Sequence, residues 1–244
     1  MSARRRAPRR PVAVAIVPAG GAGTRLGSRV PKQYLAVGGT PLLVRTVRLL
    51  ARAPSIAGVV VAAPAPRVET TRALLRRHRL PRSVTVVAGG TTRQDSVRAG
   101  LEAAPGGIPF VLVHDAVRPF IGADLVERVL AAARRWGAAT CGVPVRETVK
   151  RVRGETVEAT VDREGLWLVQ TPQGFRRELL CRAHEAARRD GFAGTDDAVL
   201  VERLGERVAM VPGLAQNMKI TSRIDLALAR RWARPRRAPG RSRA

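Results

Sequence analysis

Short apolar runs alternate along the chain with longer segments in which apolar residues recur every three or four positions. The short runs are rich in Val and Ala and predict strands at 12–17, 58–63, 84–88, 110–114, 138–143 and 207–211. The longer segments predict helices at 41–53, 67–78, 92–103, 123–136, 177–190, 196–204 and 222–232. Strands this uniformly apolar are buried on both faces. The alternation therefore predicts an α/β fold with a mostly parallel sheet and helices on both faces.

One stretch breaks this alternation. Between residues 144 and 170, Val alternates with charged residues, and Arg153–Gly154 has the composition of a turn. The pattern predicts a hairpin that is exposed on at least one face. An exposed pair of strands that leaves a compact domain offers its edges to another chain. We therefore expect one domain, residues 12–232, with an arm at about 144–170 that packs against a second subunit.

The positive charge of the chain is concentrated at its two ends. The sequence holds 44 Lys or Arg and 19 Asp or Glu, a formal net charge of +25. Residues 1–11 contain five Arg, residues 226–244 contain seven Arg, and neither segment contains an acid, so they carry 12 of the 25 charges. Without apolar periodicity, residues 1–11 and 233–244 are predicted to be basic disordered tails. The remaining charge and the aromatic content of 3% count against nucleic acid as the main partner and favour small anionic substrates.

Cysteine usage predicts a cytoplasmic protein, and hydropathy predicts that it has no membrane-spanning helix. Cys141 and Cys181 are too few for a disulfide framework, which fits a reducing compartment. No apolar run approaches the roughly 20 residues that a membrane-spanning helix needs. The basic N-terminus before residues 12–17 imitates a signal peptide, but the apolar run is short and a glycine loop follows it.

The first candidate for chemistry is the loop after the first predicted strand, PAGGAGTRLGSRVPKQY at 18–34. Lys32, Lys150 and Lys219 are the chain's three lysines, and they persist against a strong bias toward Arg. Lysine is a compact charge that reaches a phosphate oxygen where the wide guanidinium does not fit. Glycine amides can wrap a triphosphate, and Arg25 and Lys32 can neutralise charge on its α-phosphate. The spacing matches neither a Walker A motif nor a dinucleotide fingerprint.

A second motif, VLVHDAVRPF at 111–120, ends a predicted strand in an acid. Ligands of open α/β sheets bind at the carboxyl ends of the strands, so Asp115 and Arg118 should face the same crevice as the glycine loop. An aspartate there can hold Mg²⁺ or a sugar hydroxyl. For His114, packing at the strand end is a simpler explanation than catalysis.

The remaining motifs are polar segments between predicted elements. GGTTRQDSV at 89–97 can read a base or a ribose with its side chains and amides, or Thr91 or Thr92 can simply cap the helix that follows. TPQGF at 171–175, GTDDA at 194–198 and NMKIT at 217–221 read as short insertions, and Lys219 lies in the last of them.

Together and in this order, the motifs resemble those of the 2-C-methyl-D-erythritol 4-phosphate cytidylyltransferase family. The resemblance covers residues 12–229 and is carried by PAGGAGTRLGSRVPKQY, GGTTRQDSV, HDAVRPF, PVRETVKR, VDREGLW, TPQ, TDDA and NMKIT. It implies a Rossmann-like nucleotidyltransferase fold with a protruding β-arm, and a homodimer in which the arm completes the neighbour's active site. It also implies a reaction of CTP with Mg²⁺ that makes 4-diphosphocytidyl-2-C-methyl-D-erythritol in non-mevalonate isoprenoid biosynthesis.

The resemblance assigns roles to single residues. The catalytic charges fall on Arg25 and Lys32. The CTP-binding positions fall on Ala19, Gly20, Gly21, Gly23, Gly89, Asp95 and Ser96. The positions that contact the acceptor phosphate fall on Asp115, Arg118, Thr171 and Lys219, with Thr148 and Arg163 reaching in from the partner's arm, and Asp115 is also the candidate metal ligand.

Two alternatives stay open. A ribitol 5-phosphate cytidylyltransferase is similar through the first loop and HDAVRPF, but VDREGLW at 161–167 favours the methylerythritol enzyme. A non-catalytic nucleotide-binding regulator on the same fold belongs to another functional class. The set of Arg25, Lys32, Asp115 and Lys219 favours turnover, because binding alone does not require charge at both ends of the scissile phosphate.

Overall fold

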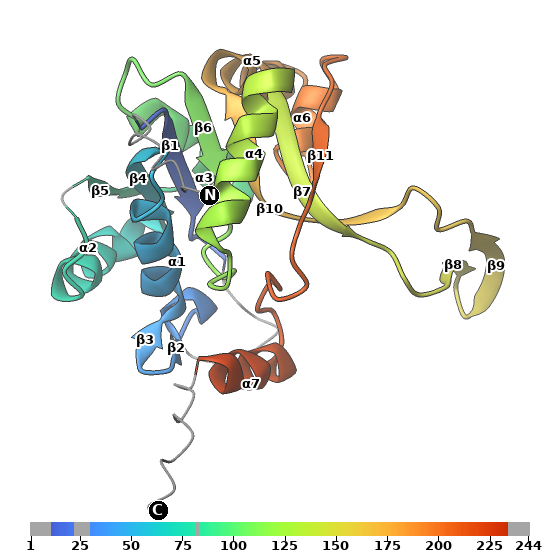
Figure 1. The fold of residues 1–244 in the computed structure, drawn as a ribbon, viewed down its shortest axis with the longest axis horizontal. Coiled ribbons are helices and arrows are strands. Elements are labelled where there is room, and N and C mark those ends of the chain that lie inside the picture. The colour runs from blue at the N-terminus through green and yellow to red at the C-terminus, as the bar shows by residue number, and fades with distance from the viewer. Residues whose placement is uncertain (1–10, 22–29, 82, 234–244) are drawn as a thin grey trace, which may run out of the picture.

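The computed structural model describes residues 11–21, 30–81 and 83–233 (Figure 1). Most of both predicted tails, together with Gly23 and Arg25 of the glycine loop, lies outside these residues.

A seven-stranded sheet forms the centre of the fold, in the order β11-β7-β10-β6-β1-β4-β5. The strands are β1 (Ala13–Pro18), β4 (Ile56–Ala63), β5 (Val84–Ala88), β6 (Phe110–Val113), β7 (Ala138–Pro144), β10 (Trp167–Arg176) and β11 (Ala209–Pro212). Strand β10 runs antiparallel to β6 and β7, while the other neighbouring pairs are parallel. The predicted mostly parallel sheet is confirmed.

Helices cover both faces of this sheet, and each face has its own apolar core (Figure 1). One core receives side chains from α1 (Leu42–Ala51), α2 (Val68–Arg77) and α4 (Ala123–Trp136), and the other from α3 (Arg93–Ala103), α5 (Arg177–Arg189) and α6 (Ala198–Glu202). Successive side chains of a strand point to opposite faces, so Ala15 and Val17 enter the first core and Ile16 the second. This two-sided burial explains the unbroken apolar runs of the sequence.

A smaller apolar cluster packs next to the loops at the carboxyl ends of the strands. Helix α7 (Arg223–Trp232) buries Leu226 against Val37 of the short hairpin β2 (Ala36–Val37) and β3 (Thr40–Pro41), and Ile220 joins the same cluster. Two short 3₁₀ helices, η2 (Lys32–Tyr34) and η3 (Ala65–Arg67), complete the elements. The α7 cluster anchors the loop that carries Lys219 to the body of the domain. None of the helices in the described ranges has both the length and the apolar character that crossing a membrane requires.

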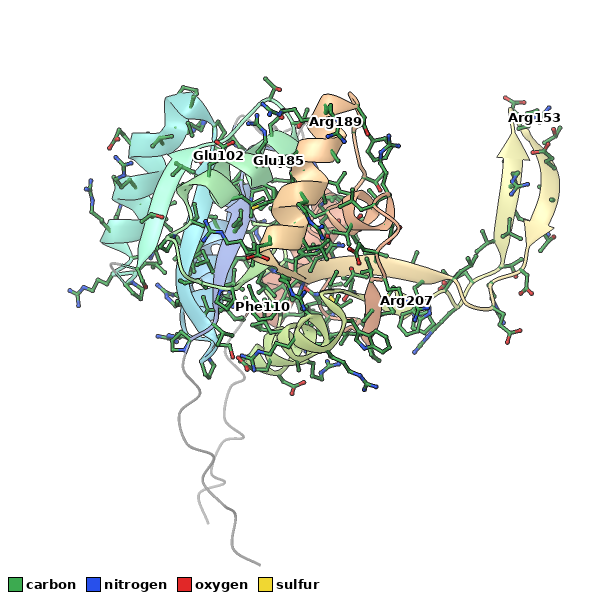
Figure 2. All side chains as sticks on the ribbon, turned by 90° about the horizontal axis from the view of Figure 1, so that it is seen from above. Glu102, Phe110, Arg153, Glu185, Arg189 and Arg207 are labelled. Carbon is green, nitrogen blue, oxygen red and sulfur yellow. The ribbon has the colours of Figure 1, made fainter. Side chains whose placement is uncertain are left out.

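The arm leaves the sheet as continuations of β7 and β10 and ends in a separate hairpin of β8 (Val149–Arg153) and β9 (Thr156–Val161). Figure 2 shows Arg153 at its far end, well away from the body of the domain. Gly154 occupies the tight turn with a φ of +58°, a conformation that glycine adopts without steric cost. The hairpin exposes 54% of Val152 and 61% of Val157, so the predicted exposed hairpin around Arg153–Gly154 is confirmed.

Two details of the prediction are wrong. Residues 171–175 are not an insertion, because they belong to β10, which lies between β6 and β7. Their polar side chains are buried but paired: the Gln173 amide, for example, donates a hydrogen bond of 2.9 Å to the Thr140 hydroxyl. The helix predicted at 196–204 is also shorter, since α6 spans Ala198–Glu202. Both cysteines are free.

His114, just after β6, is fully buried, as expected for a packed residue. Its Nε2–H donates to the carbonyl of Arg118 over 3.0 Å, which leaves Nδ1 to accept from the Thr171 hydroxyl over 3.0 Å. The Thr171 oxygen in turn accepts the amide hydrogen of Asp115. Burial lowers the pKa of His114 to about 4, so the ring is neutral and links β6 to β10.

This buried ring makes stability depend on pH. The unfolded chain binds a proton at His114 near pH 6.5 and the folded chain only near pH 4. The stability that the neutral ring contributes to the folded state is therefore complete above pH 6.5 and is lost as pH falls toward 4. Between pH 6.5 and 4, each unit by which the pH falls should lower the free energy of unfolding by up to about 1.4 kcal/mol. The measurement is urea unfolding of the wild type and His114→Gln above pH 6.5 and again between pH 6.5 and 4. Since Gln does not titrate, the gap in stability should narrow at the lower pH, and a constant gap would contradict the assignment.

Candidate functional site

Two adjoining cavities lie at the carboxyl ends of the parallel strands, where the chemistry-bearing motifs meet. The first has a volume of about 370 Å³. It is lined by backbone and side chains from the loops after β1, β5 and β6, from η2, from the start of α3 and from the loop before α7. The lining residues are Pro18, Ala19, Gly20, Gly21, Lys32, Gln33, Gly90, Thr91, Thr92, Arg93, Ser96, Asp115, Ala116, Val117 and Lys219.

Lys32 reaches the first cavity because η2 is tied to the end of β1. The buried Gln33 side chain donates its amide hydrogen to the carbonyl of Ala19, which holds the 3₁₀ turn against the strand. A Cβ placed on Gly21 would lie 3.8 Å from Lys32 Cε, so the lysine passes directly over the glycine backbone. Lys32, Ala19 and Gly21 are thus gathered in one place, as predicted for a phosphate cradle.

The start of α3 forms the opposite wall. Thr92 is the N-cap: its hydroxyl accepts the amide hydrogen of Asp95, and the Asp95 carboxylate accepts from the amide of Thr92 in return. A Cβ on Gly90 would meet Asp95 Cβ at 2.1 Å, so only glycine permits the loop to pass this close to the helix. Of the two residues suggested as a possible cap, Thr92 is the one that caps α3.

The predicted CTP-binding residues of this wall separate into two groups. Ser96 lines the cavity, and Gly20 lies beside it, since a Cβ there would be 3.5 Å from the Ser96 oxygen. Gly89 lies behind the same side chain. Asp95 is occupied in the helix cap and is not among the lining residues, so the structure does not bring this carboxylate into the cavity.

The second cavity, of about 220 Å³, adjoins the first and opens toward β10. Arg93, Asp115 and Lys219 line both cavities, so they form the boundary between them. The other lining residues of the second cavity are Arg118, Val169, Gln170, Thr171, Gln173, Thr195 and Asp196. All four residues predicted to contact the acceptor from within one chain are therefore brought together here.

A single carboxylate organises this boundary. The side chain of Asp115, 8% exposed, lies 3.0 Å from Lys219 Nζ, 3.2 Å from Arg93 Nε and 3.3 Å from Arg118 Nε. Burial favours the neutral acid, but the charges of Arg93, Lys219 and Arg118 outweigh it and hold the pKa of Asp115 well below its usual range. The site thus contains one permanent anion in contact with three cations. Arg93 is also paired with Asp197, so Arg118 and Lys219 are the cations of this group that offer positive charge to a phosphate.

This arrangement does not suit a metal ion at Asp115. Both carboxylate oxygens already contact cationic nitrogens, and a divalent cation there would face three positive groups. Within the described part of the chain, no cluster of three or more His, Cys, Asp or Glu residues could hold an ion. Asp115 therefore functions as an ion-pair partner, and the structure gives no support to its assignment as a metal ligand.

Thr148 and Arg163 lie on the arm and line neither cavity of their own chain. Both residues are exposed. The Arg163 guanidinium donates to the carbonyl of Arg146, across the two connecting segments of the arm. Their position fits the expectation that they serve a different subunit.

Sequence reasoning missed one part of the site. Arg93 donates from Nη1 to the carboxylate of Asp197 over 2.7 Å, and Asp197 also accepts from His184 Nε2 over 3.2 Å. Arg93 belongs to the GGTTRQDSV motif and Asp197 to GTDDA, and both motifs are visible in the sequence. Only the folded chain shows that they meet, 104 residues apart in sequence.

Comparisons with known proteins agree with this site. The sequence model of the 2-C-methyl-D-erythritol 4-phosphate cytidylyltransferase family matches residues 13–234. Proteins of that name from Salinibacter ruber and Geobacter metallireducens are 45% and 44% identical, over 93% and 88% of this chain and 95% and 94% of their own length. A bifunctional relative from Desulfotalea psychrophila is 42% identical over 92% of this chain, which spans 57% of that longer protein.

The fold agrees as well. The crystal structure of 2-C-methyl-D-erythritol 4-phosphate cytidylyltransferase from Thermus thermophilus superposes with a TM-score of 0.76 at 42% identity, covering 91% of this chain and 98% of that one. The family match covers the whole described domain, including the arm and every residue of both cavities. This chain belongs to the 2-C-methyl-D-erythritol 4-phosphate cytidylyltransferase family.

Proposed function

We propose that this chain joins CTP and 2-C-methyl-D-erythritol 4-phosphate to give 4-diphosphocytidyl-2-C-methyl-D-erythritol and pyrophosphate, a step of non-mevalonate isoprenoid biosynthesis. The observation that carries the proposal is the pair of adjoining cavities with a shared boundary at Arg93, Asp115 and Lys219, where cationic side chains face both cavities. Two anionic substrates can meet at such a boundary, one from each side.

CTP fits the first cavity. The backbone of Gly20 and Gly21 approaches without side chains, and Lys32 lies over it as a point charge for the phosphates. Ser96 and the first turn of α3 supply polar groups for the base and ribose. Gly23 and Arg25, which were also predicted to act on CTP from this loop, lie outside the described residues.

The acceptor phosphate fits the second cavity. Arg118 and Lys219 offer positive charge there, while Thr171 and Gln173 line the wall beside β10. A phosphate dianion is already nucleophilic at neutral pH, so its oxygen can attack the α-phosphorus in line without a general base. This agrees with the burial of His114, whose two ring nitrogens are both engaged in hydrogen bonds. Catalysis then depends on positioning and on neutralisation of charge by Lys32 and Arg25 as pyrophosphate leaves.

We propose that Mg²⁺ binds together with CTP, through the nucleotide's phosphates. Mg²⁺ commonly binds through substrate phosphates and keeps several waters. Among the described residues none is assigned to it, and the protein's own contribution is positioning and positive charge.

We further propose a cytoplasmic homodimer built through the arm. A two-stranded hairpin is marginally stable alone in water, yet β8 and β9 extend far from the sheet (Figure 1). Val152, Val157, Leu168 and Val169 are all at least 43% exposed along the arm, a concentration of apolar surface that suits a subunit contact. In such a dimer, Thr148 and Arg163 reach the neighbour's second cavity.

The test of the function is the identity of the product. Purified enzyme is offered CTP with either methylerythritol phosphate or ribitol 5-phosphate, and pyrophosphate release and the nucleotide product are both measured. Turnover with methylerythritol phosphate supports the proposal. Turnover with ribitol phosphate alone would favour the other cytidylyltransferase, and binding of CTP without any turnover would favour a regulator.

Loss of the Lys32 charge should slow the reaction. Lys32→Ala is expected to reduce turnover by about 10²- to 10³-fold, because one preorganised charge at the transition state is removed. The KM for the acceptor should change far less, since Lys32 lines only the first cavity. Arg76→Ala, which removes an exposed charge on α2, is the control and should retain normal turnover. Near-normal turnover of folded Lys32→Ala would refute the assigned role.

A site built from two chains predicts complementation between inactive subunits. Lys32→Ala and Arg163→Ala should each be inactive or nearly so as homodimers. In a mixed dimer one site collects both defects and the other collects neither, so about half of the heterodimer's sites should work. The measurement is turnover of mixed subunits, with heterodimers isolated by two different affinity tags.

A lack of complementation would have a different explanation. If both residues act within one chain, each subunit keeps its own defect, and isolated heterodimers stay inactive. That outcome would leave the arm as a structural contact only.

A further inference from the structure

A line of ion pairs and hydrogen bonds runs from the boundary between the cavities to α5, which packs in the second core. Arg93 donates from Nε to Asp115 and from Nη1 to Asp197, at 3.2 Å and 2.7 Å. Asp197, 1% exposed, accepts from His184 Nε2 on α5 at 3.2 Å. Asp197 lines neither cavity, so it cannot touch a substrate in either of them.

The geometry points to Asp197 as a positioning residue: through Arg93, it fixes the orientation of the Asp115 carboxylate at the boundary between the two substrate cavities. This inference rests on the proposed function for the chemistry that it affects. It adds a residue outside the cavities to the machinery of the transfer reaction.

Arg93 forms a bridge between two carboxylates. A guanidinium is a planar fork, and two of its nitrogens engage two different carboxylates, so the orientation of Arg93 is set by Asp115 and Asp197 together. Burial opposes the charge on Arg93, but Asp197 and Asp115 outweigh it and raise the pKa of the guanidinium. The bridge is therefore ionised under all ordinary conditions.

Asp197 is itself held in place by two neighbouring elements. Its amide donates to the side-chain oxygen of Gln173 on β10, over 3.1 Å, and its carboxylate accepts from His184 on α5. The residue is thus fixed from a strand and from a helix at once. Lys219 and Arg118, by contrast, reach Asp115 from loops. Of these three cationic partners, Arg93 connects Asp115 to the rigid interior.

Loss of the Asp197 carboxylate would release Arg93 from this arrangement. Without Asp197, Arg93 would have only Asp115 as an acid partner and could turn toward it, changing the orientation of the carboxylate and the room left for the acceptor. Small displacements of a positioned group reduce reaction rates strongly, by about 10²-fold for 1 Å. An effect of this kind appears in kcat/KM for the acceptor and acts through Asp115.

The test is a double-mutant cycle with Asp115→Asn and Asp197→Asn. Each single variant should reduce kcat/KM for the acceptor, at saturating CTP, by about 10- to 100-fold. The double variant should be no more than about threefold worse than Asp115→Asn, because Asp197 acts through that carboxylate. If the two losses multiply instead, Asp197 acts independently of Asp115 and the inference is overturned.

Two further variants separate positioning from charge and from folding. Arg93→Lys keeps the charge but replaces the planar fork, whose separate nitrogens reach the two carboxylates, with a single ammonium nitrogen, so it should resemble Asp197→Asn. Wild-type rates in Arg93→Lys would contradict the bridge. Asp190→Asn is the matched control, since Asp190 forms only exposed ion pairs at the end of α5, and it should leave kcat/KM unchanged. Thermal unfolding confirms that each variant is folded at the assay temperature.

A crystal structure of Asp197→Asn gives a readout that does not depend on the substrate. The contact between Arg93 Nε and Asp115 should shift from its 3.2 Å geometry, and an unchanged pair would overturn the inference. If the wild-type enzyme failed to use methylerythritol phosphate, the proposed function would fall, while this structural comparison would still decide the role of Asp197. The two failures are thus distinguishable.

Discussion

The buried carboxylate of Asp115 is the interaction on which the rest of the site depends. An isolated charge at this depth would be strongly disfavoured, so the acid requires its cations, and the cations in turn hold three distant segments of chain together. Arg93 comes from the start of α3, Arg118 from the loop after β6 and Lys219 from the loop before α7. Because all three converge on one side chain, the boundary between the two cavities is assembled by electrostatics at the point where the strands end.

The antiparallel strand β10 supports this boundary from within the sheet. It pairs with β6 and β7 in the middle of an otherwise parallel sheet, and it carries Thr171 and Gln173 into the second cavity. Its polar side chains are tolerated because each is paired, Thr171 with His114 and Asp115, and Gln173 with Thr140, Asp196 and Asp197. The same strand extends outward as one side of the arm. The wall of the acceptor cavity and the subunit arm are therefore parts of one element.

Much of this could be predicted from the sequence, and the limits have physical causes. The buried strands and amphipathic helices were clear from their periodicity. Lys32 stood out as a rare lysine after a glycine loop, and Asp115 as an acid at the end of an apolar strand. Strand β10 was missed because the rule that strands in a buried sheet are apolar fails where polar side chains are internally paired. Arg93 and Asp197 were missed because their partnership is a tertiary contact. The metal assignment for Asp115 was drawn from its residue type and its position at the end of a strand, and its contacts with three neighbouring cations do not favour that role.

The construction of the arm has a consequence for how this family can vary. The ladder between β7 and β10 ends at the pair Pro144 and Trp167, and the tip hairpin has its own ladder, which begins at the pair Val149 and Val161. Thr148 and Arg163 lie in the connectors between these two ladders. The number of residues in the connectors sets how far from the sheet these two side chains lie. The tip lies beyond both residues, so a change in its length or sequence leaves that reach unaltered, whereas an insertion in a connector would change it.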